Sequence, residues 1–379
     1  HHRARRPGGQ PRHTPLGRAS APVELRITVP EVQIDESFIP LQPNVLPKDT
    51  VTIRIIGDVM LHSAQIDRDY RPFLSGIESD LRSADLAIAN MEFALGGEPY
   101  SGFPAFSAPD SYAEYVRDLG VDVFLTANNH ILDKGTRGLR RTLSVYDSMD
   151  RVLHTGSGID EEHYREHNPL IIRVNGIKLG IVNPTYGTNA DQSDGYPMVF
   201  NLGDMSEPCQ AVRKARKDGA EVVLALPHWG NEYELTHSWY QTYQARDLAQ
   251  AGADYIIGSH PHVVQDMTRV SVTDSDGKEK SVPVIYSLGN AVSNMSARNT
   301  QVELMATIRI VRHGKEELEL MDPEWDWLWC SRPGFLCNNY KTIKINDYIG
   351  RRDEWLNPSD YDNMISSWNN VRNETGIDR

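Results

Sequence analysis

The sequence has few cysteines and no long apolar run. Only three cysteines occur among 379 residues, and none has the CxxC spacing of a thiolate zinc site. We expect free thiols, although Cys330 and Cys337 could close a small loop in an oxidising compartment. No run approaches the roughly 18 apolar residues of a membrane span, and the apolar core of a signal peptide is also lacking. Both a cytoplasmic protein and a mature exported one remain open.

Positive charge is scarce beyond the first residues. The net charge is −13, with 39 Lys+Arg against 52 Asp+Glu. Five arginines and no acid lie in residues 1–23, so the remainder has 34 basic against 52 acidic side chains, a net charge of −18. Such a body cannot assemble the broad cationic face that neutralises phosphates, which argues against nucleic-acid binding. An anionic ligand would need bound cations or a local basic cluster.

The chain divides by composition into four parts. Residues 1–23 are rich in Arg, Pro and Gly, which predicts a flexible basic tail. Residues 24–50 hold one short strand, "ELRITV", and a proline-punctuated connector. Residues 51–322 form the main domain. Residues 323–379 begin with the tryptophan-dense "WDWLWC" and become polar, which predicts a C-terminal extension packed on that domain.

Helices and buried strands alternate along the main domain, interrupted by hairpins, so we expect helices covering sheet layers in an α/β or mixed (α+β) arrangement. Asn175-Gly176 predicts a hairpin turn, and Ser111 with Glu114 has capping-box spacing. The predicted strands are 51–56, 84–93, 121–127, 170–174, 177–182, 220–226, 253–258, 263–272, 281–289, 302–312 and 316–321. The predicted helices are 111–120, 136–149, 207–219 and 239–252.

Several predicted strands end on a polar or metal-competent residue. Ligands of α/β sheets gather outside the carboxyl ends of strands, so we expect these residues at one rim. His, Asp, Glu and Asn together suit manganese, iron or zinc, and two such metals could activate water and hold both oxygens of a phosphoryl transfer. The strand-end residues are Asp58, Asn90, Glu92, Asn128, Asn129, His130, His228, His260, His262 and Asn290.

Each of these residues also has a structural interpretation. Asp58 alone could cap a turn, Asn128-Asn129 could be a turn pair, and His228 could be a structural hydrogen-bonding residue. Most other histidines, His154, His163 and His167 among them, receive a structural or surface interpretation. The recurrence at successive strand ends is what predicts a metal site.

Ordered motifs resemble a known family over about residues 52–295. They are "GDVML", "ANMEF", "FSAPDSYAEYVRDLGVDVFLTANNHILDKGTRGLRRTL", "HTGSG", "PHWGNEYE", "AGADYIIGSHPHVVQ" and "VIYSLGN". They resemble the CapA-type proteins of poly-gamma-glutamate capsule biosynthesis, within the calcineurin-like metallophosphoesterase superfamily. The resemblance implies a four-layer αββα sandwich with a dinuclear metal site at the strand ends.

The resemblance also implies roles for individual residues. The implied metal ligands are Asp58, Glu92 as a bridging carboxylate, Asn129, His228, His260 and His262. His130 resembles the general acid or transition-state stabiliser, and motif position implies Asn128, Tyr186, Asn189 and Asn290 as substrate contacts. The first motif departs from the superfamily's Asp-x-His, because Met60 stands at the histidine position. His62 is the nearest histidine that could complete the first metal.

Three functions follow from the resemblance. The first is a phosphatase-like hydrolase that uses one or two divalent ions (Mn, Fe or Zn) on a cell-envelope polymer or its precursor. The second is a non-catalytic metal-bearing scaffold in capsule synthesis or export, which Met60 favours. The third is hydrolysis of gamma-glutamyl amides. The implied partners are an anionic polymer or phosphoester and capsule-synthesis membrane proteins. The implied location is the extracytoplasmic face or periplasm of a bacterial envelope.

Overall fold

The computed structural model describes residues 23–25, 49–192, 194–315 and 317–378. The basic tail predicted over 1–23 lies outside these residues except for Val23, and most of the connector predicted over 24–50 is also outside them. Within the described residues no helix is long and apolar enough to cross a membrane.

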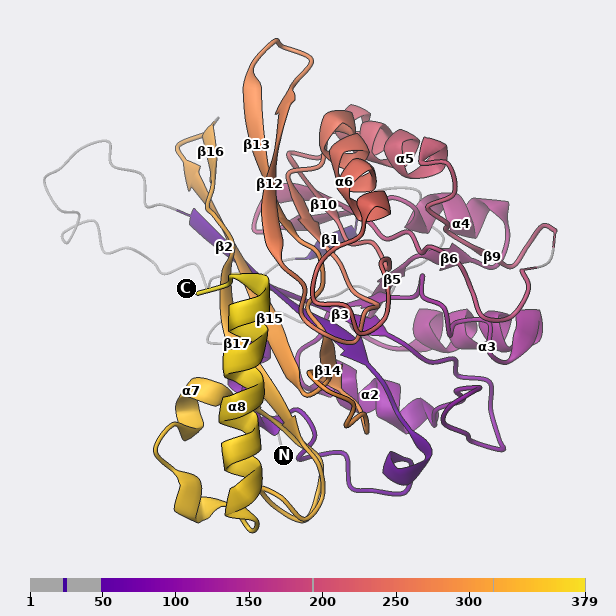
Figure 1. Ribbon diagram of the computed structural model, residues 1–379. Coiled ribbons are helices and arrows are strands. Elements are labelled where there is room, and N and C mark those ends of the chain that lie inside the picture. Colours follow the sequence, from indigo (N-terminus) through magenta and orange to yellow (C-terminus); the bar gives the residue numbers. More distant parts are fainter. Residues whose placement is uncertain (1–22, 26–48, 193, 316, 379) are drawn as a thin grey trace, which may run out of the picture.

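Two large sheets dominate the structure (Figure 1). The first sheet has seven strands in the order β1 (Val23–Leu25), β7 (Leu170–Val174), β8 (Ile177–Val182), β10 (Val222–Ala225), β11 (Tyr255–Ile257), β13 (Glu279–Ile285) and β12 (Met267–Thr273). The second sheet has nine strands. Its main order is β18 (Lys341–Lys344), β17 (Glu324–Ser331), β15 (Val302–His313), β2 (Asp49–Val59), β3 (Leu86–Met91), β4 (Val123–Leu125) and β5 (Leu153–Thr155). In addition, β14 (Asn290–Val292) pairs with β2, and β16 (Glu317–Leu320) pairs with β15.

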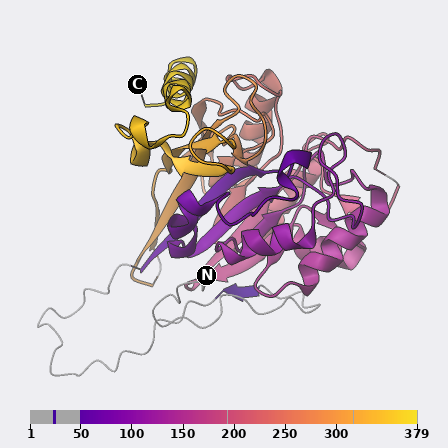
Figure 2. The ribbon, with the colours of Figure 1, turned by 90° about the horizontal axis from the view of Figure 1, so that it is seen from below.

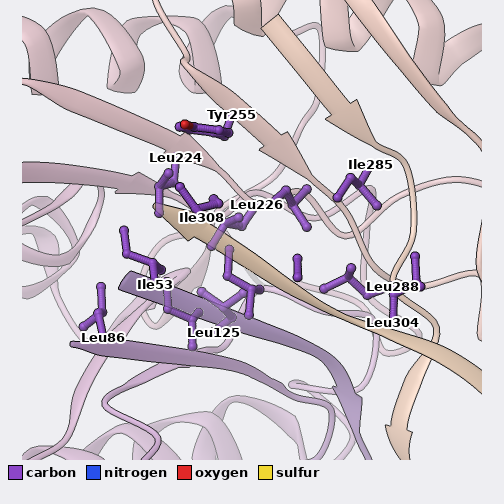
Figure 3. Close-up of a cluster of buried hydrophobic side chains, with 14 of the residues drawn as sticks. Ile53, Leu86, Leu125, Leu224, Leu226, Tyr255, Ile285, Leu288, Leu304 and Ile308 are labelled. Carbon is purple, nitrogen blue, oxygen red and sulfur yellow. The ribbon is translucent and has the colours of Figure 1, made fainter. Parts of the chain in front are cut away.

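The two sheets face each other across an apolar core. Ile53, Leu125 and Ile308 of the second sheet and Leu224 and Ile285 of the first belong to one cluster of buried side chains (Figure 3). Each fully buried aliphatic side chain of this kind contributes about 1.5–3 kcal/mol. Burial on this scale holds the sheets face to face.

Helices cover the outer face of each sheet. The second sheet is covered by α1 (Glu78–Ser83), α2 (Asp110–Asp118) and α3 (Gly135–Ser148), and the first by α5 (Ser206–Lys217) and α6 (Trp239–Ala251). Two further clusters of buried apolar side chains lie at these interfaces. The order helix, sheet, sheet, helix confirms the four-layer αββα sandwich. The remaining elements are α4 (Glu161–His167), α7 (Ile345–Tyr348), α8 (Pro358–Thr375) and the small ribbon of β6 (Ser157–Gly158) with β9 (Met198–Val199).

Local predictions had mixed outcomes. The hairpin at Asn175-Gly176 is confirmed: β7 and β8 are antiparallel, and both turn residues have positive φ, 48° and 78°. The capping box at Ser111 is wrong, because α2 begins at Asp110 with Pro109 as its N-cap and no side-chain cap bond. Cys209, Cys330 and Cys337 are free thiols, as expected.

The segment after 323 joins the second sheet. Strand β17 pairs antiparallel with β15 on one side and with β18 on the other. Met364 and Val371 of α8 are buried in the same cluster as the facing sheets. Figure 2 shows α8 in yellow at one edge of the molecule. The last residues are therefore part of the sheet and its core.

Strand direction places the carboxyl ends together. Strands β2, β3, β4 and β5 are parallel, as are β8, β10, β11 and β13. The residues that follow these strands therefore emerge at one end of each sheet.

Candidate metal centre

The strand ends of both sheets bring five metal-competent side chains together. Asp58 lies in β2 and Glu92 just after β3, whereas His228 follows β10, and His260 and His262 follow β11. Ligand atoms lie within 4.8 Å of one another in two groups that share Glu92: Asp58 with Glu92 and His262, and Glu92 with His228 and His260. We call these five residues the strand-end centre. All five are buried.

The two carboxylates of the strand-end centre are short of partners. Asp58 Oδ1 accepts a 2.7 Å hydrogen bond from Asn90 Nδ2, Asp58 Oδ2 makes a long 3.4 Å contact with His262 Nδ1, and both Glu92 oxygens have no hydrogen-bond partner. Burial would raise the pKa of Asp58, but His262 and His228 outweigh it and hold that pKa below its ordinary value. Burial and the Asp58 charge raise the pKa of Glu92 well above its ordinary value. Two buried carboxyls this close ionise together only when cations neutralise them.

His228 and Asn129 meet at one side of this centre. Asn129 Oδ1 lies 2.9 Å from His228 Nε2, and its Nδ2 donates to Asn189 Oδ1 at 3.3 Å, so the Asn129 amide turns its oxygen inward. Burial lowers the pKa of His228 to about 3, which keeps the imidazole neutral. A neutral imidazole and an amide oxygen are both competent metal ligands.

The loop after β11 holds its two histidines in an unusual backbone conformation. The φ angles of His260 and His262 are 112° and 61°, a region that non-glycine residues rarely adopt and that is found at functional sites. His262 Nδ1 donates to Asn290 Oδ1 at 2.8 Å, leaving Nε2 toward Glu92 Oε1 at 3.8 Å. His260 Nδ1 is buried without a partner. Asn290 therefore orients a proposed ligand, and both rings fit metal binding.

The unpartnered oxygens and nitrogens of the strand-end centre form a donor set that fits divalent cations. Glu232, which the sequence analysis did not single out, adds a third group: its carboxylate lies 4.0 Å from His262 Nε2 and within reach of His260. Its side chain is 43% exposed, so it approaches from the solvent side. Its only sequence signal is its place four residues after His228.

His130 lies beside the centre in a separate hydrogen-bonded pair. Its Nδ1 lies 2.6 Å from Asp133 Oδ2, which also accepts from the Phe106 N–H at 2.8 Å. The ring packs edge-on against Phe106 with centroids 4.6 Å apart. Because a carboxylate only accepts, Nδ1 carries the proton and Nε2 is the nitrogen free to exchange one. Asp133 is a second residue that the sequence analysis missed.

Asn128 is hydrogen-bonded within the turn that it forms with Asn129 and His130. It is fully buried, and its Nδ2 donates to Met91 O at 2.8 Å and Asn90 Oδ1 at 3.2 Å. Its Oδ1 accepts from the His130 N–H at 3.1 Å. These bonds hold the turn that carries Asn129 and His130. The substrate contacts expected of Asn128 and of Asn290, which is also buried, stay predictions.

Tyr186 and Asn189 lie at the exposed rim. The Tyr186 ring is 47% exposed, and its centroid lies 4.5 Å from that of His260. Asn189 is exposed, and its backbone N–H donates to Asn129 O at 2.8 Å. Both therefore retain the position expected of substrate contacts.

Met60 and His62 lie outside the centre. Met60 is buried in the apolar cluster beneath α1 and α2. His62 Nδ1 accepts from the Asn294 N–H at 3.1 Å, and burial lowers its pKa to about 4. His62 belongs to none of the metal-competent groups in the described residues. It therefore does not replace the missing histidine.

Comparisons with known proteins identify a family. Residues 52–295, more than half of the chain, match the family described as "Bacterial capsule synthesis protein PGA_cap". The chain is 24% identical over 305 residues to the capsule biosynthesis protein CapA of Bacillus anthracis, covering 76% of this chain and 71% of that one. It is 25% identical over 210 residues to the PGA biosynthesis protein CapA of Bacillus subtilis (strain 168), covering 54% and 51%.

Solved structures with a related fold are more distant. A 5'-nucleotidase precursor from Thermus thermophilus aligns with a TM-score of 0.45 at 16% identity, over 74% of this chain and 54% of that one. A purple acid phosphatase from yellow lupin aligns with a TM-score of 0.38 at 10% identity, over 78% and 54%. The chain thus spans about half the length of each of these two solved proteins.

Proposed function

Because this chain belongs to the bacterial capsule synthesis protein PGA_cap family, we propose that it is a metal-dependent, phosphatase-like hydrolase of capsule polymer biosynthesis. Its place of action would be the extracytoplasmic face of the cell envelope or the periplasm, beside capsule-synthesis membrane proteins. Its substrate would be an anionic polymer or a phosphoester precursor. The observation that carries the proposal is the group of unpartnered, buried oxygens at Asp58 and Glu92, flanked by three histidines.

The donor set defines what the centre would hold. Asp58, His262 and Glu92 would bind one divalent cation, and Glu92, His228, His260 and Asn129 the other, with manganese, iron or zinc as candidates. Such a pair supplies a Lewis acid and lowers the pKa of water for attack on phosphorus. It would also supply the positive charge that the acidic body of the chain lacks.

The chain's own residues supply orientation and a proton. Asp133 accepts the Nδ1–H of His130, and its charge would stabilise the doubly protonated ring, whose Nε2–H would pass to the leaving oxygen and be regained from water. Tyr186 and Asn189 would contact the substrate from the exposed rim. Asn90, Asn128 and Asn290 fix the residues around them by hydrogen bonds.

A scaffold role is the second candidate, and Met60 is the observation that favours it. The histidine position of the first motif is occupied by a side chain facing an apolar cluster, which leaves one cation with fewer imidazole ligands. A metal-bearing protein could then assist polymer synthesis or export without turnover.

The test measures bound metal and turnover of purified protein. Wild type, His130→Ala and the control His237→Ala, whose imidazole pairs with Asp266 instead, are assayed on aryl phosphomonoesters and diesters and on poly-gamma-glutamate. We expect about a 10²- to 10⁴-fold loss for His130→Ala and none for the control. If poly-gamma-glutamate is cleaved and the phosphoesters are not, the bond that the protein hydrolyses is an amide and not a phosphoester. If the protein binds metal but turns over no substrate, and capsule still forms with His130→Ala, the scaffold role is favoured.

A further inference from the structure

Three aromatic side chains lie in contact on the first two turns of α6. Their ring centroids are 5.3 Å apart for Trp239 and Tyr240, 5.0 Å for Trp239 and Tyr243, and 5.9 Å for Tyr240 and Tyr243. Trp239 is 73% exposed and Tyr240 is 62% exposed. Single apolar side chains are common on a protein surface, whereas exposed rings in mutual contact mark a binding surface. We call these three residues the aromatic platform.

The aromatic platform lies at the rim that carries the strand-end centre. Helix α6 connects β10 to β11, and these two strands are parallel neighbours in the first sheet. The helix must therefore return from the carboxyl end of β10 to the amino end of β11, so its first turn lies at the carboxyl-end side. His228 and His260 follow these strands at the same side. Figure 1 shows α6 on the outer side of the first sheet.

Exposed aromatic residues continue from the platform to the centre itself. Tyr233 is 51% exposed, and its ring centroid lies 6.2 Å from that of His262. The Tyr233 N–H donates to Pro261 O at 2.8 Å, which fixes the loop 229–238 against the segment that carries His262. Six positions separate Tyr233 from Trp239, so their Cα atoms are at most about 20 Å apart. An oligomer of a few units would therefore contact the platform and the centre together.

The loops at this rim contain no lysine or arginine. This holds for the segment that follows each of the strands β2, β3, β4, β5, β8, β10, β11 and β13, up to the first basic residue after it. Acids do occur there, Glu232 and Glu234 among them. The segments without lysine or arginine are 60–67, 92–116, 126–133, 156–164, 183–212, 226–245, 258–268 and 286–297.

This charge pattern separates the candidate occupants of the platform. A polyanion such as poly-gamma-glutamate would be repelled by the acids along the loops, and only bound cations would attract it. An anionic lipid surface is disfavoured for the same reason, because such surfaces recruit basic segments. A neutral, hydroxyl-rich chain meets no repulsion, and carboxylates such as Glu232 accept hydrogen bonds from its hydroxyls.

We propose that the aromatic platform binds neutral sugar rings of a glycan chain whose phosphoester lies at the strand-end centre. This inference rests on the proposed function, because it names the substrate class of the same site. The axial C–H bonds of a pyranose form an apolar face that packs on the electron-rich face of an aromatic ring. The cations of the centre would then neutralise one phosphoryl group instead of a chain of charges.

The first experiment measures binding without turnover. The full chain is titrated calorimetrically, in EDTA, with three neutral probes: chitopentaose, cellopentaose and maltopentaose. We expect heat of binding with at least one probe, and Trp239→Ala/Tyr240→Ala should weaken that binding at least about 10-fold. Trp239→Phe/Tyr240→Phe keeps both rings and should retain most of the affinity. The control Leu356→Ala removes a side chain that is 59% exposed on another part of the chain, and it should change nothing.

Two outcomes of this titration would overturn the proposal. One is that no pentasaccharide binds, and the other is that the alanine variant binds as tightly as wild type. Circular dichroism checks that the alanine variant is folded. Poly-gamma-glutamate and vesicles of phosphatidylglycerol with phosphatidylethanolamine are tested in parallel. If either binds wild type and loses that binding in the alanine variant, the platform serves an anionic polymer or a membrane, and the glycan assignment is wrong.

A second experiment separates this inference from the proposed function. With metal present, kcat/KM is measured on an aryl phosphomonoester and on the binding pentasaccharide phosphorylated at its reducing end. We expect Trp239→Ala/Tyr240→Ala to lower kcat/KM at least about 10-fold for the sugar phosphate and to leave the aryl ester unchanged. Equal losses on both substrates would overturn the platform's role. If neither substrate is turned over, the proposed function has failed, whereas the metal-free titration still decides whether the platform binds glycans.

Discussion

At the residue scale, the roles at the strand ends depend on side chains that orient other side chains. His130 offers Nε2 for proton exchange only because Asp133 holds Nδ1–H. Asn290 orients His262 by accepting its Nδ1–H. Asn90 orients Asp58 by donating to its Oδ1. Substitutions of these orienting residues should therefore change reaction rates more than binding.

Asp133→Asn tests this arrangement. The amide keeps an acceptor for the Phe106 N–H but loses the charge that stabilises a protonated His130. We expect kcat for an aryl phosphoester to fall at least about 10-fold with KM little changed. Steady-state kinetics would show this, and a change confined to KM would contradict the orienting role.

Glu303 makes stability depend on pH. Burial raises the pKa of Glu303 well above the ordinary value, and the negative charge of Asp58 raises it further. Neither carboxyl oxygen of Glu303 has a hydrogen-bond partner. The folded chain keeps this proton while the unfolded chain loses it above about pH 4.5, so stability falls as pH rises from there toward the folded pKa.

Glu303→Gln should remove this dependence. The free energy of unfolding of the variant minus that of wild type should grow with pH above about 4.5, by at most ~1.4 kcal/mol per unit. Urea denaturation at several pH values measures it. A difference that stays constant between about pH 5 and pH 8 would mean that Glu303 does not hold a proton in the folded state.

At the element scale, the parallel pairing of β14 with β2 positions Asn290 beside Asp58. Asn290 is the register partner of Asp58, and the Asp58 N–H donates to Gly289 O at 3.0 Å. This close approach requires glycine at position 57, because a Cβ there would lie 2.0 Å from Gly289 O. Residues 289–290 can therefore approach Asp58 only because Gly57 has no side chain.

Gly57→Ala should force these two segments apart. We expect a loss of about 1–3 kcal/mol in the free energy of unfolding, together with weaker metal binding. Gly187→Ala is the control, because a Cβ there meets nothing within 4 Å, and its change should stay within about 0.5 kcal/mol. Denaturant titrations of both variants give the comparison, and equal values would refute the steric argument.

At the scale of the whole molecule, the last residues complete the core. Removing 357–379 deletes α8 and uncovers Trp327, but it leaves every strand of the two described sheets paired. We expect a soluble, folded chain that is less stable by several kcal/mol, since each buried aliphatic side chain contributes about 1.5–3 kcal/mol.

Truncation after residue 322 should be more severe. It also removes β17 and β18 and leaves the long strand β15 without its partner along 302–307. An uncovered edge of this kind pairs with other chains, so we expect aggregation. Solubility and gel filtration distinguish the two truncations; a soluble monomer after residue 322 would show that 323–379 is dispensable for the sheet.

Periodicity predicted buried strands alternating with helices, and strand-end chemistry predicted a common rim, because both are local patterns; the four layers were implied by the family resemblance. The contacts between side chains could not be predicted from the sequence. Asp133 lies three residues from His130, yet nothing in that spacing says that the two side chains meet. Asp147, His154 and His163 lie close together although they come from three elements, and no common spacing in the sequence predicts that contact. The pairing of β17 with β15 was hidden because tryptophan-rich segments suit a packed extension as well as a strand.

Because the strand-end residues come from both sheets, the centre can form only late in the synthesis of the polypeptide. Asp58 and His262 are separated by about two hundred positions in the chain, and the facing layers must close before their side chains meet. A growing polypeptide on the ribosome therefore cannot form the proposed metal centre until the segment that carries His262 has been made. If the centre binds metal as proposed, metal content measured with metal in excess would report the fraction of molecules that have finished folding.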